Sequence, residues 1–522
     1  MKSTRRSPLK RILFGRTIVI ILLLALQIYL LFAAWNWLSG YLTIITSAQE
    51  VIGLVTVVFI FNRRENPSYK LVWMIPVLVF PIFGTLFYIF VQLNLGTLRE
   101  RKRIREISEE TKPYRVQNDA VLLKLEQSSP RDARLAEYLY SASGYPVYSG
   151  ANISYFSTGE DYFASLKESL AKAEKFIFLE YFFICEGIML GEVLDILKEK
   201  VAEGVDVRVL YDGTTSMSGV HFGYYKKLRK MGIKARVFSP IRPALSTVQN
   251  NRDHRKIAVM DGKVAFTGGI NLADEYINME IRFGHWKDAG VRVEGEPAEA
   301  FTGMFYEMWN AAVRRGDMDV DALAKRLSGL DTQSNDASVS EGFIIPYADS
   351  PLDNEAVGEN VYFDMLNTAK DYVHIMTPYL IPDASMVSCL TYAAQRGVET
   401  MIIMPRIPDK KTVNMLGHSY YGELIDRGVR IFEYKPGFIH SKVVVSDNCK
   451  AAVGTVNFDY RSFYLHFECG VYMCGCGAVE DIEKDYQSTL EQCVEITRED
   501  CKKYPIWKKL IGRALRLIAP LL

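Results

Sequence analysis

The chain has 522 residues, enough for several hydrophobic cores, which excludes a small disulfide-stabilised scaffold. Its 62 Lys and Arg residues nearly balance its 61 Asp and Glu residues, so the overall charge gives no basis for binding nucleic acid. The balance conceals an uneven distribution, because residues 1–105 have a net charge of +11, residues 106–501 a net charge of −16, and residues 502–522 six cations and no acid.

Residues 1–95 predict a membrane region. An uncharged run at 17–38 is long enough to cross a hydrocarbon core of about 30 Å, and further apolar runs follow at 41–61 and 71–91. The first run exceeds the apolar core of a usual signal peptide, so we expect an anchored, multi-pass membrane protein. Prolines in the third run leave a re-entrant segment as the alternative to a third full span, and the basic clusters do not decide on which side the body lies.

The remainder of the chain predicts an α/β fold. Residues 96–140 are charged and helix-compatible and indicate a connector. Helical and apolar strand patterns then alternate in two similar stretches, 141–327 and 343–500, which are separated at 328–342 by a linker rich in Ser, Asp, Asn and Gly. We therefore expect two duplicated α/β lobes that form a pseudo-dimer, preceded by N-terminal transmembrane helices.

Residues 501–522 predict a basic amphipathic helix. One face carries apolar side chains at helical spacing, and Lys509, Arg513 and Arg516 follow the opposite face. The apolar positions are Trp507, Leu510, Ile511, Ala514, Leu515 and Ile518. Such a helix suits the surface of an anionic bilayer, and a terminal helix docked on the body is the alternative.

The second lobe repeats five informative positions of the first at a constant offset of 186 residues. The pairs are His254 and His440, Lys256 and Lys442, Asp261 and Asp447, Gly268 and Gly454, and Asn271 and Asn457. A constant offset over five positions indicates a duplication. In a strand, a His and a Lys two residues apart project from the same face. Each Asp precedes a residue typical of turns, so a structural role for it is as well supported as a catalytic one.

Two His, two Lys and two Asn residues that converge between lobes suit a phosphate ester. Lys supplies positive charge, and the Asn amides can donate to the non-bridging oxygens. A His side chain, with an ordinary pKa of about 6.5, can act as nucleophile or as general acid. We expect no metal ion and no cofactor, since the Lys pair supplies the charge that a bound cation otherwise provides.

The segments HRKIAVMD with GGIN and HSKVVVSD with GTVNFDYRS resemble the paired HKD motifs of the phospholipase D superfamily. Over almost its whole length the chain is similar to bacterial cardiolipin synthases. The resemblance implies transfer of a phosphatidyl group between two phosphatidylglycerol molecules, giving cardiolipin and glycerol through a phosphohistidine. It also implies a protein of the bacterial cell membrane that binds anionic lipids.

The resemblance also assigns roles to individual residues. It implies catalytic roles for His254, Lys256, Asp261, His440, Lys442 and Asp447. It implies that Lys256, Lys442, Asn271 and Asn457 hold phosphate, and that Asp288 and Glu468 orient the two His. By analogy His254 is the nucleophile, although the symmetry of the repeat permits the reverse. His466 departs from the family, which usually has Asn at this position.

Other functions remain as alternatives. A hydrolytic membrane phospholipase D that releases phosphatidic acid would use the same residues. A nuclease is disfavoured because the acidic body lacks a basic footprint, and a catalytically dead scaffold is disfavoured because both motifs are intact. The segment with Cys469, Cys474 and Cys476 reads as a strand with buried thiols rather than a zinc site. The sequence does not determine the oligomeric state.

Overall fold

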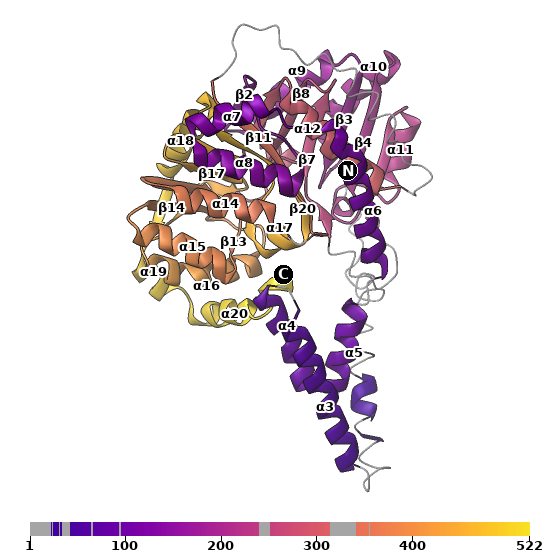
Figure 1. Cartoon of the computed structure of the whole chain (residues 1–522), viewed down its shortest axis with the longest axis vertical. Coiled ribbons are helices and arrows are strands. Elements are labelled where there is room, and N and C mark those ends of the chain that lie inside the picture. Colours follow the sequence, from indigo (N-terminus) through magenta and orange to yellow (C-terminus); the bar gives the residue numbers. More distant parts are fainter. Residues whose placement is uncertain are drawn as a thin grey trace. The chain divides into compact units, whose positions relative to one another are not determined.

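The structure is a computed structural model that describes residues 22, 25–30, 32–33, 42–63, 66–92, 95–239, 251–313, 341–353 and 355–521. The chain divides into two compact units (Figure 1). One unit comprises Met1–Arg99, Ile241–Gln249 and Leu517–Leu522, and the other comprises Glu100–Pro240 and Asn250–Arg516. The predicted linker at 328–342 lies outside the described residues except for its last two positions.

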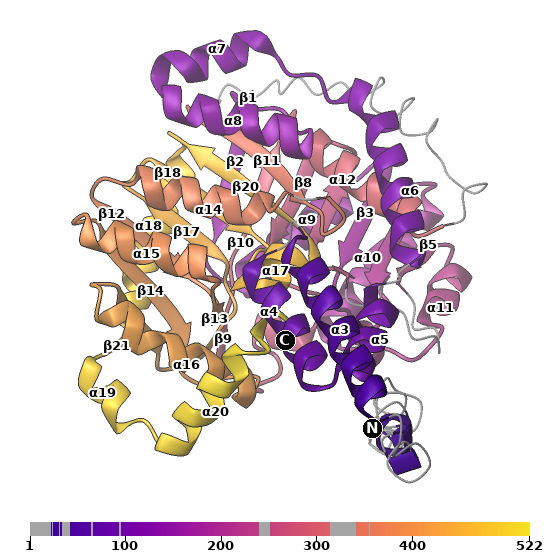
Figure 2. The same ribbon diagram turned by 60° about the horizontal axis from the view of Figure 1, so that its bottom comes forward.

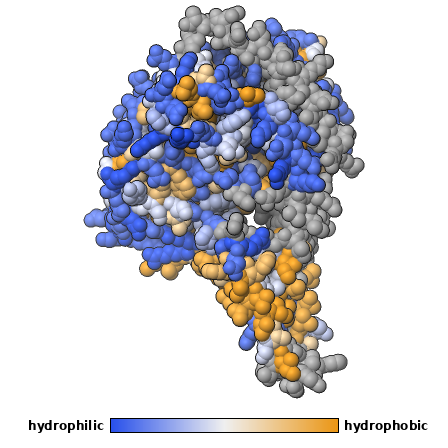
Figure 3. Space-filling view, viewed as in Figure 1, coloured by the Kyte–Doolittle hydropathy of each residue, from blue (hydrophilic) through white to orange (hydrophobic). Residues whose placement is uncertain are grey.

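The first unit contains α3 (Leu42–Phe61), α4 (Pro67–Val79) and α5 (Pro81–Gln92). Helices α4 and α5 form an antiparallel hairpin, since the ring of Trp73 lies 5.5 Å from that of Phe87. The helices approach closely at Gly84, where a Cβ would lie 2.4 Å from the Pro76 carbonyl oxygen. Apolar side chains cover much of the visible surface of these helices (Figure 3).

The predicted membrane spans are described only in part. The span at 17–38 lies outside the described residues apart from short helical fragments, and the span at 41–61 corresponds to α3. The apolar run at 71–91 forms two helices, because Phe80 separates α4 from α5, and neither helix alone, at about 1.5 Å per residue, reaches 30 Å. Within the described residues, no helix combines the length and the apolarity needed to cross a membrane.

The second unit contains two sheets with the same internal strand order. The first lobe has, in spatial order, β2 (Asn152–Phe156), β10 (Gly290–Glu294), β8 (Val264–Gly268), β7 (Lys256–Met260), β3 (Phe176–Tyr181), β4 (Asp206–Asp212) and β5 (Lys234–Phe238). The second lobe has β11 (Phe343–Asp349), β20 (His466–Cys474), β18 (Lys450–Gly454), β17 (Val443–Ser446), β12 (Tyr372–Met376), β14 (Glu399–Pro405) and β15 (Arg430–Tyr434), with β1 (Tyr148–Ser149) and β21 (Cys493–Ile496) at the edges. In both sheets the last three of these seven strands are parallel and the others antiparallel. The α/β duplication predicted from the sequence is therefore present in the fold.

Helices cover the outer flanks of the sheets. In the first lobe these are α9 (Gly159–Lys172), α10 (Ile188–Ala202) and α11 (Tyr224–Lys230), and in the second lobe α14 (Val357–Thr368), α15 (Ala384–Gln395) and α16 (Lys411–Ile425) (Figure 2). Side-chain caps begin two of them, since Thr158 accepts from the Asp161 amide and Asp383 from the Met386 amide. The chain enters the lobes through α6 (Leu95–Thr111), α7 (Asp119–Ser128) and α8 (Pro130–Ser143), in the region predicted as a helical connector.

The inner faces of the two sheets share one hydrophobic core. It contains Phe178 and Ile257 from the first lobe and Val443 and Val471 from the second. Helix α12 (Pro297–Ala311) contributes several of its side chains to this core, and all of its residues except Glu299 and Ala311 are buried. Further elements of the second lobe are α17 (Tyr460–Tyr464) and α18 (Gly477–Leu490). The two lobes are therefore parts of a single folded body.

The C-terminal segment of the second unit consists of α19 (Arg498–Lys503) and α20 (Ile506–Arg516). Helix α20 docks on α16, where Gly512 lies so close to the Met415 carbonyl that a Cβ would be 2.3 Å from its oxygen. The guanidinium of Arg516 lies 3.8 Å from the ring centre of Tyr420. Arg516, on the polar face of the predicted amphipathic helix, thus contacts α16, which agrees with the docked alternative.

Candidate active site

Both copies of the repeated motif lie at strand starts in the interior. Lys256 is the first residue of β7 and His254 lies two residues before it, while His440 and Lys442 lie just before β17. All four side chains are buried, with at most 7 % of each residue exposed. The two His and two Lys side chains lie close together, as expected. Both lysines act electrostatically on both histidines, and Lys256 also acts on Lys442.

Short strands cross between the lobes just before each histidine. The strand β6 (Arg252–Asp253) pairs with the start of β20 in the second lobe, and the His254 amide donates to the Phe467 carbonyl at 2.9 Å. Reciprocally, β16 (Gly437–Ile439) pairs with β9 (His285–Lys287) in the first lobe. Each histidine is therefore held against a strand of the opposite lobe.

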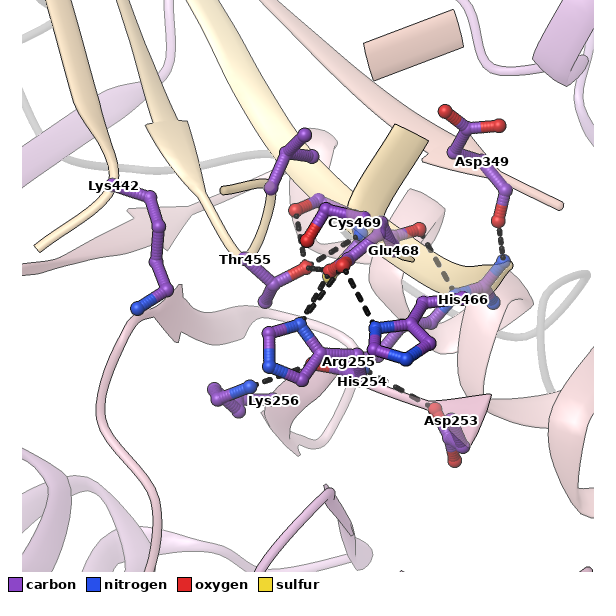
Figure 4. A network of polar contacts seen from close by, with 12 residues as sticks. Asp253, His254, Arg255, Lys256, Asp349, Lys442, Thr455, His466, Glu468 and Cys469 are labelled. Atoms are coloured by element: carbon purple, nitrogen blue, oxygen red, sulfur yellow. Dashed lines mark hydrogen bonds and ion pairs between the residues drawn. The ribbon is translucent and has the colours of Figure 1, made fainter. Parts of the chain in front are cut away.

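This exchange gives each histidine an acidic partner from the other lobe. Nδ1 of His254 lies 2.9 Å from both carboxylate oxygens of Glu468, and Nδ1 of His440 lies 2.7 Å from Oδ2 of Asp288. The carboxylates have their own donors. The Thr455 hydroxyl donates to Glu468 (Figure 4), and the Ala289 amide donates to Asp288. With the proton on Nδ1 facing the acid, the Nε2 lone pair of each ring is left for chemistry.

Burial and the lysines hold both imidazoles in the neutral form. Burial, with Lys256 and Lys442 nearby, lowers the pKa of His254 well below its usual value. Burial and Lys442 lower the pKa of His440 to about 4, against the opposing effect of Asp288. Burial would raise the pKa of Asp288, but His440 and Lys442 hold it below the usual value. The site thus contains an ionised acid beside a neutral ring.

The lysines themselves are easily deprotonated. Burial lowers the pKa of Lys256 to about 8 and that of Lys442 to about 7. Their ammonium groups lie within their own motifs, since Lys256 donates to the His254 carbonyl at 2.7 Å and Lys442 donates to the His440 carbonyl. An anionic ligand between them would favour their charged forms.

The two asparagines differ in their surroundings. The Asn271 amide group is engaged at both ends, because it donates to the Tyr276 hydroxyl at 2.7 Å and accepts from the Phe183 amide at 3.0 Å. Asn457 is buried, and its Oδ1 has no hydrogen-bond partner in the described part of the chain. This oxygen is an acceptor, so it can receive a hydrogen bond from a ligand hydroxyl but cannot bind a phosphate oxygen.

The catalytic alternative for the two motif aspartates is not supported by their positions. Asp261 follows the far end of β7 and accepts hydrogen bonds from three backbone amides, those of residues 174–176. Asp447 follows β17 and accepts in the same way from residues 370–372. At about 3.3 Å per residue, the strand places Asp261 some 20 Å from His254. Both carboxylates therefore anchor a loop to a strand end, as the structural alternative predicts.

Several residues near the site were not assigned to it from the sequence. The ring of Phe182 lies 4.6 Å from that of His254, and Tyr276 lies 5.3 Å from His440. Thr455 was also not assigned to the site from the sequence. The offset of 186 pairs it with Gly269, where a Cβ would lie 1.9 Å from Asp288. This difference between Thr and Gly at paired positions of the repeat could have drawn attention to Thr455.

His466 lies beside the proposed nucleophile. Its ring centre is 5.2 Å from that of His254, and Trp286 holds the corresponding place beside His440 at 5.4 Å. Among the described residues, His254, His466 and Glu468 form the one group of three side chains whose ligand atoms, all within 4.8 Å of one another, could hold a metal ion. The predicted buried strand is confirmed for Cys469 and Cys474, which lie in β20.

Comparisons with known proteins agree with this arrangement. The family described as "Cardiolipin synthase, PLD-like domain" matches residues 166–309 and 362–490, and the family described as "Phospholipase D-nuclease N-terminal" matches residues 51–92. A cardiolipin synthase of Alkalihalophilus pseudofirmus is 31% identical over 93% of this chain and 95% of its own length. An uncharacterized protein of Streptococcus mutans is 49% identical over 90% of this chain and 99% of its own.

Among solved structures, the phosphatidylserine synthase of Haemophilus influenzae Rd KW20 matches with a TM-score of 0.57 and 15% identity. The match covers 74% of this chain and 99% of that one. At this identity the likeness concerns the fold alone.

Proposed function

The chain belongs to the cardiolipin synthase family with PLD-like domains and is an enzyme of the phosphatidyltransferase class, and we propose that it joins two phosphatidylglycerol molecules into cardiolipin and glycerol. The observation that carries this proposal is the pair of buried His and Lys sets, each completed by a carboxylate from the opposite lobe. One set can attack phosphorus while the other serves the leaving and entering alcohols.

In the first step, Nε2 of His254 attacks the phosphorus of one phosphatidylglycerol. A P–N bond forms as the bond from phosphorus to the glycerol oxygen breaks, and Nε2–H of His440 donates its proton to that oxygen. The entering phosphodiester is an anion, so it raises the pKa of the neighbouring rings and lets His440 carry this proton. Glu468 stabilises the positive charge that develops on the His254 ring.

In the second step, the terminal hydroxyl of a second phosphatidylglycerol attacks the phosphohistidine. Its proton passes to Nε2 of His440, its oxygen bonds to phosphorus, and the P–N bond breaks to restore neutral His254. In both steps Lys256, Lys442 and Asn457 lie where they can offset the negative charge on the non-bridging oxygens.

Membership of the cardiolipin synthase family supports transfer to a lipid alcohol over hydrolysis. The alternative, a hydrolytic phospholipase D that releases phosphatidic acid, uses the same residues and differs only in whether water or lipid alcohol reaches the phosphohistidine.

The products of purified protein test this proposal. Detergent-solubilised protein supplied with phosphatidylglycerol should yield cardiolipin and glycerol in equal amounts, with chelator present as well as without it. His440→Ala should lower the rate by about 10²–10⁴-fold, and His254→Ala should abolish the phosphohistidine. The exposed His221 provides the control, since His221→Ala should leave the rate unchanged. Phosphatidic acid as the sole product would establish the hydrolytic alternative.

We also propose that the protein works at the bacterial cell membrane, where its lipid substrates reside. Exposed apolar side chains on α3 to α5 support this location. After alkaline carbonate extraction of cell membranes, the full chain should remain in the membrane pellet. Release of the chain into the supernatant would show that it binds only at the membrane surface.

A further inference from the structure

His466 is a buried imidazole that makes no hydrogen bond to the described part of the chain. The residue is 7 % exposed, and neither ring nitrogen has a hydrogen-bond partner among the described residues. Its Nδ1 lies 3.7 Å from Oε1 of Glu468, beyond hydrogen-bond distance. Burying such a polar group without a partner is costly, and the proposed transfer reaction makes no use of either ring nitrogen.

The surroundings of His466 match the ligand set of a particular metal. His254, His466 and Glu468 offer one ligand atom each, all within 4.8 Å of one another. Two imidazoles and a carboxylate are typical zinc ligands, and atoms bound at about 2.0–2.2 Å to one tetrahedral ion lie about 3.4 Å apart. Small movements of the side chains would therefore close the site. Burial lowers the pKa of His466 to about 3, so its ring is neutral as ligation requires.

The other half of the site lacks this third ligand. Beside His440 and Asp288, the place of His466 is taken by Trp286, whose indole nitrogen can donate a hydrogen bond but cannot bind a metal. The repeat therefore supplies a histidine and an acid twice, but a metal-binding trio only once. The trio includes the proposed nucleophile.

We propose that His254, His466 and Glu468 form an inhibitory site for zinc or a similar borderline-soft divalent cation. The nitrogen of His254 that faces Glu468 is Nδ1, so metal binding at Nδ1 moves the ring proton to Nε2. Nε2 then has no lone pair with which to attack phosphorus, and Glu468 becomes a ligand instead of an orienting group. The ring proton stays on His254, so the ring itself releases no proton. The inhibition, though not the binding, rests on the proposed transfer reaction.

Metal binding is tested first, in the absence of lipid. Metal-stripped full-length protein in detergent is titrated with Zn²⁺ by calorimetry and with Co²⁺ by visible absorption. His466→Asn, which introduces the residue usual in the family, should weaken binding of both ions by at least about tenfold. The control is His418→Asn, which removes a histidine that lies 3.2 Å from Glu433 outside the site and should leave binding unchanged. Equal affinities of wild type and His466→Asn would overturn the proposal.

Inhibition is tested next, with each protein compared to its own zinc-free rate. Zinc should abolish lipid transfer by the wild type, chelator should restore it, and the midpoint should rise in His466→Asn by the same factor as the dissociation constant. Full activity or stimulation of the zinc-saturated wild type would overturn the inhibitory role. If no zinc-free protein transfers lipid, the proposed function fails, while the cobalt titration still decides whether the site exists.

Discussion

At the scale of single residues, each catalytic histidine proposed here depends on an acid from the other lobe. Glu468 holds His254 through contacts of 2.9 Å to both oxygens, and Asp288 holds His440 at 2.7 Å. The role of such an acid is to fix the tautomer and to stabilise the charged ring. The two lysines determine the electrostatic environment of the site, because their positive charges attract an anionic substrate.

Replacing the acid tests its orienting role. Glu468→Gln removes the charge while keeping the size, so the rate of phosphatidyl transfer should fall by about 10²–10⁴-fold, with little change in KM. The matched control is Glu483→Gln, since Glu483 contacts Nδ1 of His374 at 3.0 Å in a similar geometry away from the site. An unchanged kcat per folded protein in Glu468→Gln would show that Glu468 acts only on stability.

The pKa of Lys442 predicts the alkaline limb of the pH profile. Lys442, with a pKa of about 7, is charged below this pH and loses its charge above it, so kcat/KM should decline as the pH rises through about 7. In Lys442→Arg the guanidinium stays charged, so the profile should lose this limb even if the rate is lower. Lys484→Arg, at an exposed lysine, is the control. An identical limb in wild type and Lys442→Arg would assign the titration to another group.

At the scale of elements, two short strand pairs between the lobes determine which acid faces which histidine. One close helix contact determines how α20 docks on α16. The crossed pairs β6 with β20 and β16 with β9 bring the acids to the histidines. Helix α20 is docked by Gly512 and Arg516, yet Ile506, Trp507 and Leu510 remain exposed, so docking leaves most of its apolar face uncovered.

A methyl group at Gly512 should loosen α20 from α16. Gly512→Ala places a Cβ 2.3 Å from a backbone oxygen, which cannot easily move, and should cost about 1–3 kcal/mol of docking free energy. Hydrogen exchange of the α20 amides should become faster while that of β7 stays unchanged. Gly191→Ala in α10 is the matched control, because nothing lies within 4 Å of its Cβ and it should be neutral or stabilising. Unchanged exchange in α20 would mean that the contact contributes nothing to docking.

At the scale of the molecule, the two lobes share one core and one site. Phe178 lies in this core, 4.7 Å from the ring of Phe305, in a cluster that includes strands of the second lobe. Neither half of the site is complete in a single lobe, because each histidine takes its acid from the other. We therefore expect the lobes to unfold together.

A cavity in the shared core tests this coupling. Phe178→Ala should cost about 3–5 kcal/mol of unfolding free energy and should speed hydrogen exchange to a similar extent in β7 of the first lobe and β17 of the second. Phe222→Ala, at a side chain 76 % exposed, should change neither. Faster exchange confined to the first lobe would show that the lobes are separate folding units.

The sequence by itself determined the α/β duplication and the members of the motif. These are local properties, since a His and a Lys two residues apart share a strand face wherever the strand lies, and a constant offset needs no knowledge of contacts. The resemblance added the two orienting acids. The motif by itself did not show that Asp261 is structural while His254 is in the site. That distinction requires knowing that the two residues lie at opposite ends of strand β7.

Only the tertiary structure decided which groups meet across the lobes. That Glu468 contacts His254, that His466 lies beside His254, and that Arg516 lies on Tyr420 depend on contacts between residues about 100 to 200 positions apart. Such contacts arise because burying the shared core brings the two sheets together, and the strand exchange then fixes which side chains face each other. No periodicity in the chain encodes that pairing.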